Sequence, residues 1–551
     1  MVPKENDSIP KKVLGHFCFR GIINLQQNTL RKRVDCIMFS AINQVVLPLD
    51  IGYAIPKDDP VIILSELCDE LDYSRICEKY LRNWRKHSPK TLFKIIVYAY
   101  MRNIYSSREI ETACNRDICF MWLLNNEPTP DHSTITRFIS DKLAPEIEDL
   151  FYQLINKLYE LGEIKFENLF VDGTKIEANA NRYTFVWAKS VEKNAEKLRI
   201  KIDNFLEILT DRYLVKFKTA EEYYEFLARR IAALNMVFVH GKGKRKTQLQ
   251  RDFEILEEYL ERKQKYKEYF RTLNGRKSFS KTDTDATFMR MKEDHMLNGQ
   301  LKPGYNVQIG VENEYILGVG LFPNPTDVTT LIPFLERVRN RTGRIISNII
   351  ADAGYESEEN YKYLDENEQT AYIKPQNYEV SKTRKYKNNE FRTENMEYDA
   401  ENDLYICKNG QKLKYIYTQK STSKNGYDVE KKVYRNESCE GCPYRKQCHK
   451  SKYERRTIKV SQNFKRQRER SLENISTSKG ILLRMNRSIQ VEGAFGVIKE
   501  DKGFRRFLVR GKQETETQFF LLSFAFNIQK YFNRKQGNRL GQDLFEKKIA
   551  A

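Results

Sequence analysis

Two acidic residues stand where a protein could hold a metal ion. Asp172 follows the apolar run Leu169–Val171 and precedes Gly173, which predicts a short buried strand that ends at the acid and turns on the glycine. The apolar stretch 344–351 ends in the same way at Asp352. A carboxylate at the end of a strand is held in fixed geometry by the sheet. These two acids are therefore the first candidates for a site.

Glu492 is the third candidate. The segment 481–499 predicts a helix, despite two glycines, and Glu492 shares a face with its apolar residues. The residues within about 60° of it on a helical wheel are Ile481, Met485, Ile489 and Phe495. A carboxylate that faces inward must be paired, protonated or bound to a metal. Glu492 is therefore either a metal ligand or a buried acid paired with Arg487 or Arg484.

The three acids predict a two-metal centre. Mg²⁺ prefers oxygen ligands and takes one or two carboxylates per ion, with water and phosphate oxygens, and Mn²⁺ can replace it. Two such ions roughly 4 Å apart assist an in-line phosphodiester displacement, because they serve the attacking and the leaving oxygen. Asp172 would bridge both ions, and Asp352 and Glu492 would each hold one.

Other acids compete for these roles. Asp283 and Asp285, in TDTDATF, are the reserve candidates for a metal ligand. A capping or turn role is the alternative for both. Asp327 is a further competitor.

Four cysteines form a second candidate metal centre. Cys407 is followed, after 31 residues, by the pattern C-x2-C-x5-C of Cys439, Cys442 and Cys448. Four thiolates with one close pair predict a tetrahedral, structural Zn²⁺ site, since four protein ligands leave no open position. His449 could replace Cys448 as a ligand. Ordinary reduced cysteines are the alternative interpretation.

The charge balance favours a polyanionic partner. The 551 residues include 95 Lys and Arg against 75 Asp and Glu, a net charge of +20, which suits nucleic acid. A basic but ordinary soluble protein is the alternative. Residues 450–512 alone hold 18 basic and 6 acidic residues, with Phe504 and Phe507 among the arginines. We expect phosphate contacts from Lys499, Arg484, Arg487, Lys502, Arg505, Arg506 and Arg510.

The chain shows no membrane segment. No apolar run approaches the ~18 residues of a membrane span, and the first residues, MVPKENDSIPKK, are polar. We therefore expect a cytoplasmic protein without a membrane partner.

The region before Asp172 is predicted to be helical. Apolar residues recur at helical spacing from Leu47 to about residue 162. One such face consists of Leu92, Ile95, Ile96 and Ala99. Asp131 or Ser133 can cap a helix start. This region is either a DNA-binding domain or a packing and dimerisation unit.

The acids fall on an alternation of strands and helices. After Asp172 comes a charged helical insertion, either a solvated spacer or a carrier of the basic loop 241–246. Two strands that turn near 313–314 follow, then a helix closed by Gly343, the strand before Asp352, a helix and a strand. With a late helix this order is close to that of an RNase H-like α/β domain. We predict an α+β, α-rich chain: a helical N-terminal domain and an RNase H-like α/β catalytic domain with helical and zinc-ribbon-like insertions.

The predicted domains follow from these boundaries. A basic arm occupies 1–34 and a helical domain for DNA binding or dimerisation occupies 35–162. The catalytic domain spans 163–545, with a helical insertion at about 183–275 and a Cys-rich insertion at about 385–455.

These motifs, in this order, resemble those of bacterial insertion-sequence transposases of the DDE class. The likeness runs from about Leu47 to about Asn533. It is carried by LPLD, TPDHSTITRF, DGTKIEANANRYTFVW, TDTDATFM with GYNVQIGVE, DAGYESEEN, the CxxC-type insertion, and VEGAFGVIK with GFRRFLVRG. The resemblance places the family's acidic triad on Asp172, Asp352 and Glu492, and the lysine that follows the triad's Glu on Lys499.

One part of the pattern departs from the family. Many relatives place a Tyr and an Arg upstream of the Glu, where this chain has Met485 and Ser488. Arg484 and Arg487 each stand one residue earlier.

The resemblance implies cut-and-paste DNA transposition, in which ends are nicked and the freed 3′-hydroxyl attacks target DNA. It implies double-stranded DNA with terminal inverted repeats, target DNA, and a homodimer on paired ends as partners. An RNase H-fold nuclease without strand transfer is the alternative enzyme. A zinc-containing DNA-binding protein with an inactive catalytic domain is the alternative that is not an enzyme.

Overall fold

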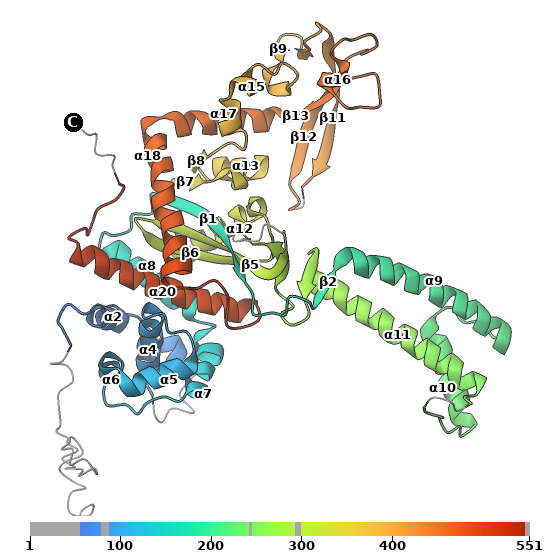
Figure 1. Ribbon diagram of the computed structural model, residues 1–551, viewed down its shortest axis with the longest axis horizontal. Helices are drawn as coiled ribbons and strands as arrows, with labels where there is room; N and C mark the ends of the chain where they lie inside the picture. Colours follow the sequence, from blue (N-terminus) through green and yellow to red (C-terminus); the bar gives the residue numbers. More distant parts are fainter. Residues whose placement is uncertain (1–54, 79–86, 242–244, 292–298, 424, 546–551) are drawn as a thin grey trace, which may run out of the picture.

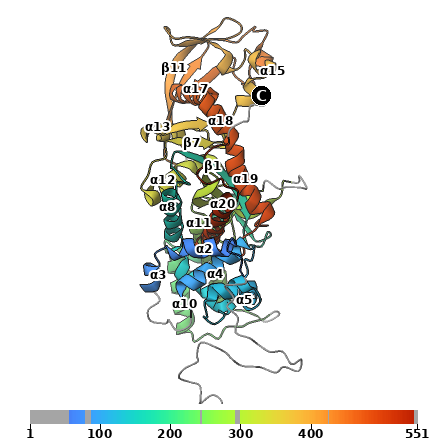
Figure 2. The same cartoon turned by 90° about the vertical axis from the view of Figure 1, so that its left-hand side faces the viewer.

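The computed structural model describes residues 55–78, 87–241, 245–291, 299–423 and 425–545. The predicted arm at 1–34 lies outside these ranges. Figure 2 shows three regions in succession: N-terminal helices, a central sheet with its helices, and a second sheet. Among the helices of the described ranges, none has both the length and the apolar character to cross a membrane.

The N-terminal region is helical, as predicted. Its core includes the expected face of α4, where Leu92, Ile95, Ile96 and Ala99 are fully buried. Asp131 caps α7 by accepting a hydrogen bond from the Thr134 amide at 2.6 Å. The helices are α2 (Pro60–Asp69), α3 (Ser74–Glu78), α4 (Pro89–Met101), α5 (Ser107–Arg116), α6 (Ile118–Leu124), α7 (His132–Arg137), the π-helix Phe138–Leu143 and α8 (Ile147–Glu160).

The central sheet is mixed. Its strands are β1 (Asn168–Glu177), β4 (Thr287–Arg290), β5 (Leu301–Glu312), β6 (Tyr315–Phe322), β7 (Asn348–Ala351) and β8 (Thr370–Ile373). The order is β4-β5-β1-β7-β8, and β6 also pairs with β5. β5 is antiparallel to β1 and β6, and β7 and β8 run parallel to β1. The predicted hairpin turns at Asn313 and Glu314, both with positive φ.

Two details of the strand prediction were wrong. β1 does not end at Asp172 but continues through Gly173 to Glu177. β5 is not half-buried: its residues are buried without a break from Pro303 to Glu312. The second difference arises because Asn306 and Gln308, which were expected to face solvent, are buried in hydrogen bonds with Asp327 and Tyr355.

Helices from the second half of the chain complete the core (Figure 1). α20 (Lys512–Gln536) packs on β6, α4 and α8, as expected for a closing helix. Its Asn527 side chain accepts from the Ile316 amide and donates to the Ile316 carbonyl, both at 2.8 Å. The other helices are α12 (Leu331–Thr342), α13 (Glu358–Glu366), α17 (Gln462–Ser476), α18 (Ser478–Arg487) and α19 (Gly493–Gly496). Gly343 ends α12 in the left-handed conformation, as predicted.

The segment after β1 forms a helical projection, which Figure 1 shows extending away from the sheet. It contains α9 (Ala188–Tyr213), α10 (Ala220–Ala233) and α11 (Gln248–Leu273), with β2 (Phe185–Trp187) and β3 (Ser278–Ser280) paired at its base. Leu198, Ile202 and Phe205 of α9 belong to a hydrophobic cluster separate from the main core. The projection therefore packs on itself.

A second, antiparallel sheet lies beyond β8. Its order is β13-β12-β11-β10-β9. The strands are β9 (Glu397–Asp399), β10 (Leu404–Ile406), β11 (Lys412–Thr422), β12 (Asp428–Arg435) and β13 (Thr457–Val460). Short helices α14 (Tyr378–Ser381), α15 (Arg384–Lys387) and α16 (Arg445–Cys448) accompany it. The four candidate zinc ligands belong to this part of the chain.

Candidate active site

Asp172 and Asp352 lie side by side on adjacent parallel strands. Val171 of β1 pairs with Ala351 of β7, and each acid is the next residue of its chain. Asp172 is 7% exposed. Asp352 lies just past the end of β7, where its Oδ1 accepts from the Gly354 amide at 2.7 Å. The sheet therefore brings the first two predicted acids together.

Glu492 approaches the same place through Arg487. Arg487 Nη2 donates to Glu492 Oε1 at 2.8 Å, and Arg487 Nη1 lies 3.7 Å from Asp172 Oδ2. One guanidinium thus links the carboxylates of the first and third acids. This is the ion pair that the sequence offered as the alternative to metal ligation. Arg484 points elsewhere, because its Nη1 donates to the Tyr378 hydroxyl at 3.2 Å.

The predicted inward orientation of Glu492 was wrong. Its side chain is 54% exposed, and Ile481 and Ile489, expected in the core, are exposed too. The segment 478–501 is helical, but its α-helical parts alternate with π-helical turns at Ser488–Glu492 and Val497–Asp501. Ile481 precedes the first π-turn and is exposed like Glu492, so the face that they share points outward instead of into the core. Phe495 follows the π-turn at 488–492 and is buried, because a π-turn holds more residues than an α-turn and rotates later side chains off that face.

A fourth acid, Asp327, lies near the pair. It opens the 3₁₀ turn Asp327–Thr329 after β6, a strand that runs in the same direction as β1 and β7. Its Oδ2 is 3.6 Å from where a Cβ on Gly354 would be, and that position is 2.9 Å from Asp352 Oδ1. Acids that follow strands of one direction gather at one edge of a sheet. That signal, applied to β6 as to β7, would have favoured Asp327 over the reserve acids Asp283 and Asp285.

Asp283 and Asp285 have structural roles, as their alternative interpretation held. Asp283 accepts from the Tyr305 hydroxyl at 2.9 and 3.0 Å and from the Gly511 amide at 3.3 Å. Burial raises the pKa of Asp283, against the lowering effect of these hydrogen bonds. Asp285 accepts from the Lys512 amide at 2.9 Å, at the start of α20. Both acids therefore anchor the beginning of that helix.

The predicted DNA contacts divide into exposed and buried residues. Arg505, Arg506 and Arg510 are exposed. Lys499 and Lys502 are each 7% exposed. The Lys502 ammonium donates to the carbonyls of Tyr100 and Met101 at 3.4 and 3.3 Å, which assigns this lysine to the junction with the N-terminal helices. We therefore do not retain Lys502 among the candidate DNA contacts.

The four candidate zinc ligands border one small cavity. Cys407, Cys439, Cys442 and Cys448 line it together with His449. Asn436 Nδ2 donates to Cys439 Sγ at 3.1 Å, and Arg456 donates to Cys448 Sγ. Across the described ranges, however, no three or more His, Cys, Asp or Glu side chains converge closely enough to hold a metal ion. This applies to the cysteines and to the acidic site alike.

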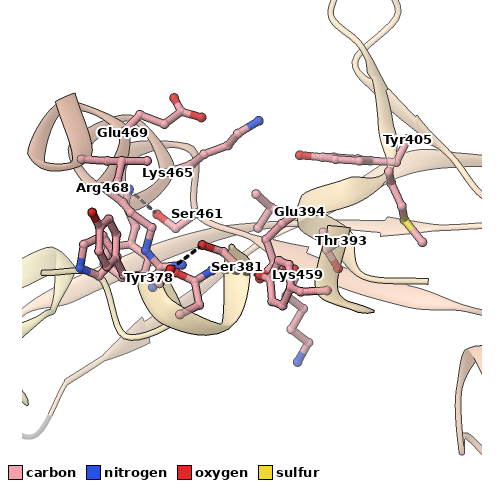
Figure 3. Close-up of a pocket in the computed structure, with 17 residues that line it drawn as sticks. Tyr378, Ser381, Thr393, Glu394, Tyr405, Lys459, Ser461, Lys465, Arg468 and Glu469 are labelled. Carbon is pink, nitrogen blue, oxygen red and sulfur yellow. Dashed lines mark hydrogen bonds between the residues drawn. The ribbon is translucent and has the colours of Figure 1, made fainter. Parts of the chain in front are cut away.

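A cavity of about 470 Å³ lies between α14, α17 and the second sheet. Figure 3 shows Lys465, Arg468 and Glu469 of α17 on one side and Tyr378 and Ser381 of α14 on another. Arg468 is held by Glu356 through two hydrogen bonds of 2.6 and 2.9 Å. None of the candidate acids lines this cavity, so it does not mark the site of the predicted chemistry.

Two family models match separate parts of the chain. A transposase domain (DUF772) matches residues 49–141, whose described part includes helices α2 to α7, and a transposase DDE domain matches residues 406–532. The second match includes Glu492, whereas Asp172 and Asp352 lie between the two. No curated protein and no solved structure matches the chain. Both matched models are transposase domains, which indicates DNA transposition and is consistent with an insertion-sequence DDE transposase.

Proposed function

We propose that the chain cuts DNA at the ends of its element and joins the freed 3′-hydroxyl to target DNA, in a cut-and-paste reaction that depends on divalent metal ions. The observation that carries the proposal is the pairing of Val171 with Ala351, which sets Asp172 beside Asp352. Glu492 completes the site from the helix 478–501, where Arg487 links it to Asp172.

We infer that the central sheet is RNase H-like. In favour of this assignment, β1 carries Asp172 and pairs on one side with β5, which is antiparallel to both β1 and β6. On the other side of β1, β7 and β8 run parallel to it. The helical projection interrupts this order between β1 and β5. Such a sheet supplies rigid positions for acids at strand ends.

The residues present are suited to Mg²⁺ or Mn²⁺. Asp172 and Asp352 offer hard oxygen donors, and Mg²⁺ usually takes only one or two carboxylates, with water and phosphate oxygens. Arg487 already supplies positive charge between Asp172 and Glu492. We propose that Asp172, Asp352 and Glu492 hold two ions once Glu492 turns from Arg487. Bound there, such ions would activate the attacking oxygen and stabilise the leaving one.

The chain's own residues bind and orient DNA. Asp172 is buried, and Arg487 Nη1 lies 3.7 Å from its Oδ2. We propose that Arg487 turns from the acids to a phosphate when DNA binds. Arg505, Arg506 and Arg510 are exposed after the helix that carries Glu492. We propose that they hold the phosphate backbone of the element's end. Two copies on paired ends, each bound to a terminal inverted repeat, are our proposal for the assembly.

The test uses the purified full-length chain, DNA carrying the ends that flank its gene, and Mg²⁺ or Mn²⁺. We expect 3′-hydroxyl nicks and joined products with wild type, and neither with Asp172→Asn or Asp352→Asn, while both variants still bind DNA. Asp285→Asn is the matched control, since its carboxylate caps α20, and it should cut normally.

The same gel separates the alternatives. Nicks without joined products would favour an RNase H-fold nuclease without strand transfer. DNA that is bound but never cut with either metal would favour a DNA-binding protein with an inactive catalytic domain, and would overturn the proposal.

A further inference from the structure

Asp327 is the acceptor at the end of a buried chain of hydrogen bonds. Its Oδ1 accepts from Asn306 Nδ2 at 2.8 Å and from Gln308 Nε2 at 2.9 Å. Asn306 and Gln308 are two residues apart on β5, so their side chains share one face of the sheet. They are 1% and 0% exposed. Asp327 therefore satisfies two amide groups that have no access to water.

The chain of hydrogen bonds continues to the turn that carries Asp352. Gln308 Oε1 accepts from the hydroxyl of Tyr355. Tyr355 is fully buried and ends the 3₁₀ turn Ala353–Tyr355, whose cap is Asp352. Only two residues separate the tyrosine from the acid. The order Asp327, Gln308, Tyr355 thus connects the end of β6 to the end of β7.

The direction of these hydrogen bonds depends on the carboxylate. An ionised Asp only accepts, so Gln308 must present its NH₂ group to Asp327 and its oxygen to Tyr355. Tyr355 must then donate its proton. Burial raises the pKa of Tyr355 well above its ordinary value, and Asp327, Asp172 and Asp352 add to the effect. The hydroxyl therefore stays protonated.

The same side chains lie against the backbone beside Asp172. Gly173 pairs with Gln308 across β1 and β5. A Cβ on Gly173 would come within 2.1 Å of Gln308 Nε2 and 2.7 Å of Asp327 Oδ1. Gly173 is thus required for this close approach and not for a turn. The network touches the backbone next to Asp172 at one end and the turn of Asp352 at the other.

We propose that Asp327 is a positioning residue of the active site: it fixes the orientation of Gln308, which through Tyr355 holds the Asp352 turn beside Asp172. This inference rests on the proposed function. Residues that orient metal ligands typically change metal affinity by about 10- to 100-fold when they are removed. Asp327 should therefore act on metal binding and not on DNA binding.

The first test is Asp327→Asn, which keeps the shape of the side chain but lets it donate as well as accept. We expect DNA binding to be unchanged and the Mg²⁺ concentration for half-maximal cleavage to rise by roughly 10-fold. Without DNA, a fixed Mg²⁺ concentration should raise the melting temperature of Asp327→Asn by less than it raises that of wild type. Glu336→Gln, an exposed acid on α12, is the control and should match wild type in all three measurements.

Exchanging the amide and the carboxylate between positions 327 and 308, which reverses the hydrogen bond between them, gives the decisive comparison. In Asp327→Asn/Gln308→Glu, the new amide donates to the new carboxylate, which can again accept from Tyr355. This double variant should recover a wild-type Mg²⁺ requirement. Tyr355→Phe keeps the ring and removes the hydroxyl donor, so it should raise the Mg²⁺ requirement as Asp327→Asn does. It replaces Asp327→Asn as the test if that variant does not fold.

The outcomes separate this inference from the proposed function. If wild type cleaves and Asp327→Asn and Tyr355→Phe keep its Mg²⁺ dependence, the positioning role is wrong while the function stands. The positioning role is also wrong if Asp327→Asn and Tyr355→Phe lower the melting temperature by the same amount with and without Mg²⁺, and the double variant does not recover the wild-type Mg²⁺ requirement. If wild type itself never cleaves, the proposed function fails.

Discussion

Arg487 donates a hydrogen bond to Glu492 at 2.8 Å and reaches toward Asp172 with its other nitrogen, at 3.7 Å. The Arg487 side chain is only 20% exposed, so its charge is poorly screened by water. It lies where the proposed metal ions would bring positive charge. Arg487 therefore balances two of the candidate acids, and the proposed metal ions would have to displace it.

Replacing Arg487 by Gln should separate these two sources of positive charge. Without metal, we expect the free energy of unfolding to fall by about 1 to 3 kcal/mol, because two carboxylates lose their partner. The increase in melting temperature on adding Mg²⁺ should exceed that of wild type, since no guanidinium competes. Arg484→Gln, one turn earlier and bonded to Tyr378, is the control. Equal Mg²⁺ responses in all three proteins would contradict this account.

The glycine after Asp172 should tolerate no side chain. Gly173→Ala places a methyl group 2.1 Å from Gln308 Nε2, and we expect a loss of about 1 to 3 kcal/mol in unfolding free energy from this overpacking. Gly496→Ala is the matched control, because nothing lies within 4 Å of its Cβ position in a helix. The free energy of unfolding of Gly496→Ala should rise by about 0.5 to 1 kcal/mol, because Ala has a higher helix propensity than Gly. Urea unfolding measures both, and a neutral Gly173→Ala would show that Gln308 can move aside.

The sequence predicted that Asp172 and Asp352 lie together, although β1 does not end at Asp172 but continues to Glu177. Asp172 and Asp352 follow apolar runs, and parallel pairing of those runs brings the acids together. The outward orientation of Glu492 could not be predicted, because Ile481 and Ile489, which share its face, are apolar and yet exposed. Periodicity also assumes an α-helix throughout, and the π-turn at 488–492 rotates Phe495 off that face. Asp327 was only one competitor among several, since its importance depends on a register that pairs Gly173 with Gln308. No local pattern reveals such a pairing.

Lys502 gives the protein a specific dependence on pH. Burial lowers its pKa from 10.5 to about 8, against the opposing effect of Asp501. Between these values the folded protein binds fewer protons than the unfolded chain, so the free energy of unfolding rises with pH. Relative to Lys502→Met, wild type should gain roughly 1 kcal/mol per pH unit from pH 8 to 10.

Urea unfolding at several pH values, with Lys450→Met as an exposed control, measures the Lys502 effect. The difference between wild type and Lys450→Met should stay constant over the same range. A constant difference between wild type and Lys502→Met would mean that the folded Lys502 titrates like a solvated lysine.

The cysteine cavity makes a separate prediction about zinc. Four cysteines line it, and Asn436 and Arg456 donate to two of the sulfurs. In this structure the four side chains do not converge closely enough to hold a metal ion, so zinc binding requires them to move together. If they do, we expect purified protein to hold about one zinc ion per chain, in a tetrahedral site. Cys442→Ser should lower the zinc content and destabilise the second sheet. Cys77→Ser, at an exposed cysteine outside the cavity, should do neither.

Elemental analysis of the intact protein gives its zinc content, and a chelator titration followed by circular dichroism shows whether removal of zinc unfolds it. Together they test the zinc prediction. Zinc binding requires Arg456 to leave Cys448, so Arg456→Gln should retain the metal. A protein that contains no zinc after purification in zinc-supplemented buffer, and whose stability is unchanged in Cys442→Ser, would identify these residues as ordinary reduced cysteines. The acidic site would be unaffected by that result, since none of its residues borders the cysteine cavity.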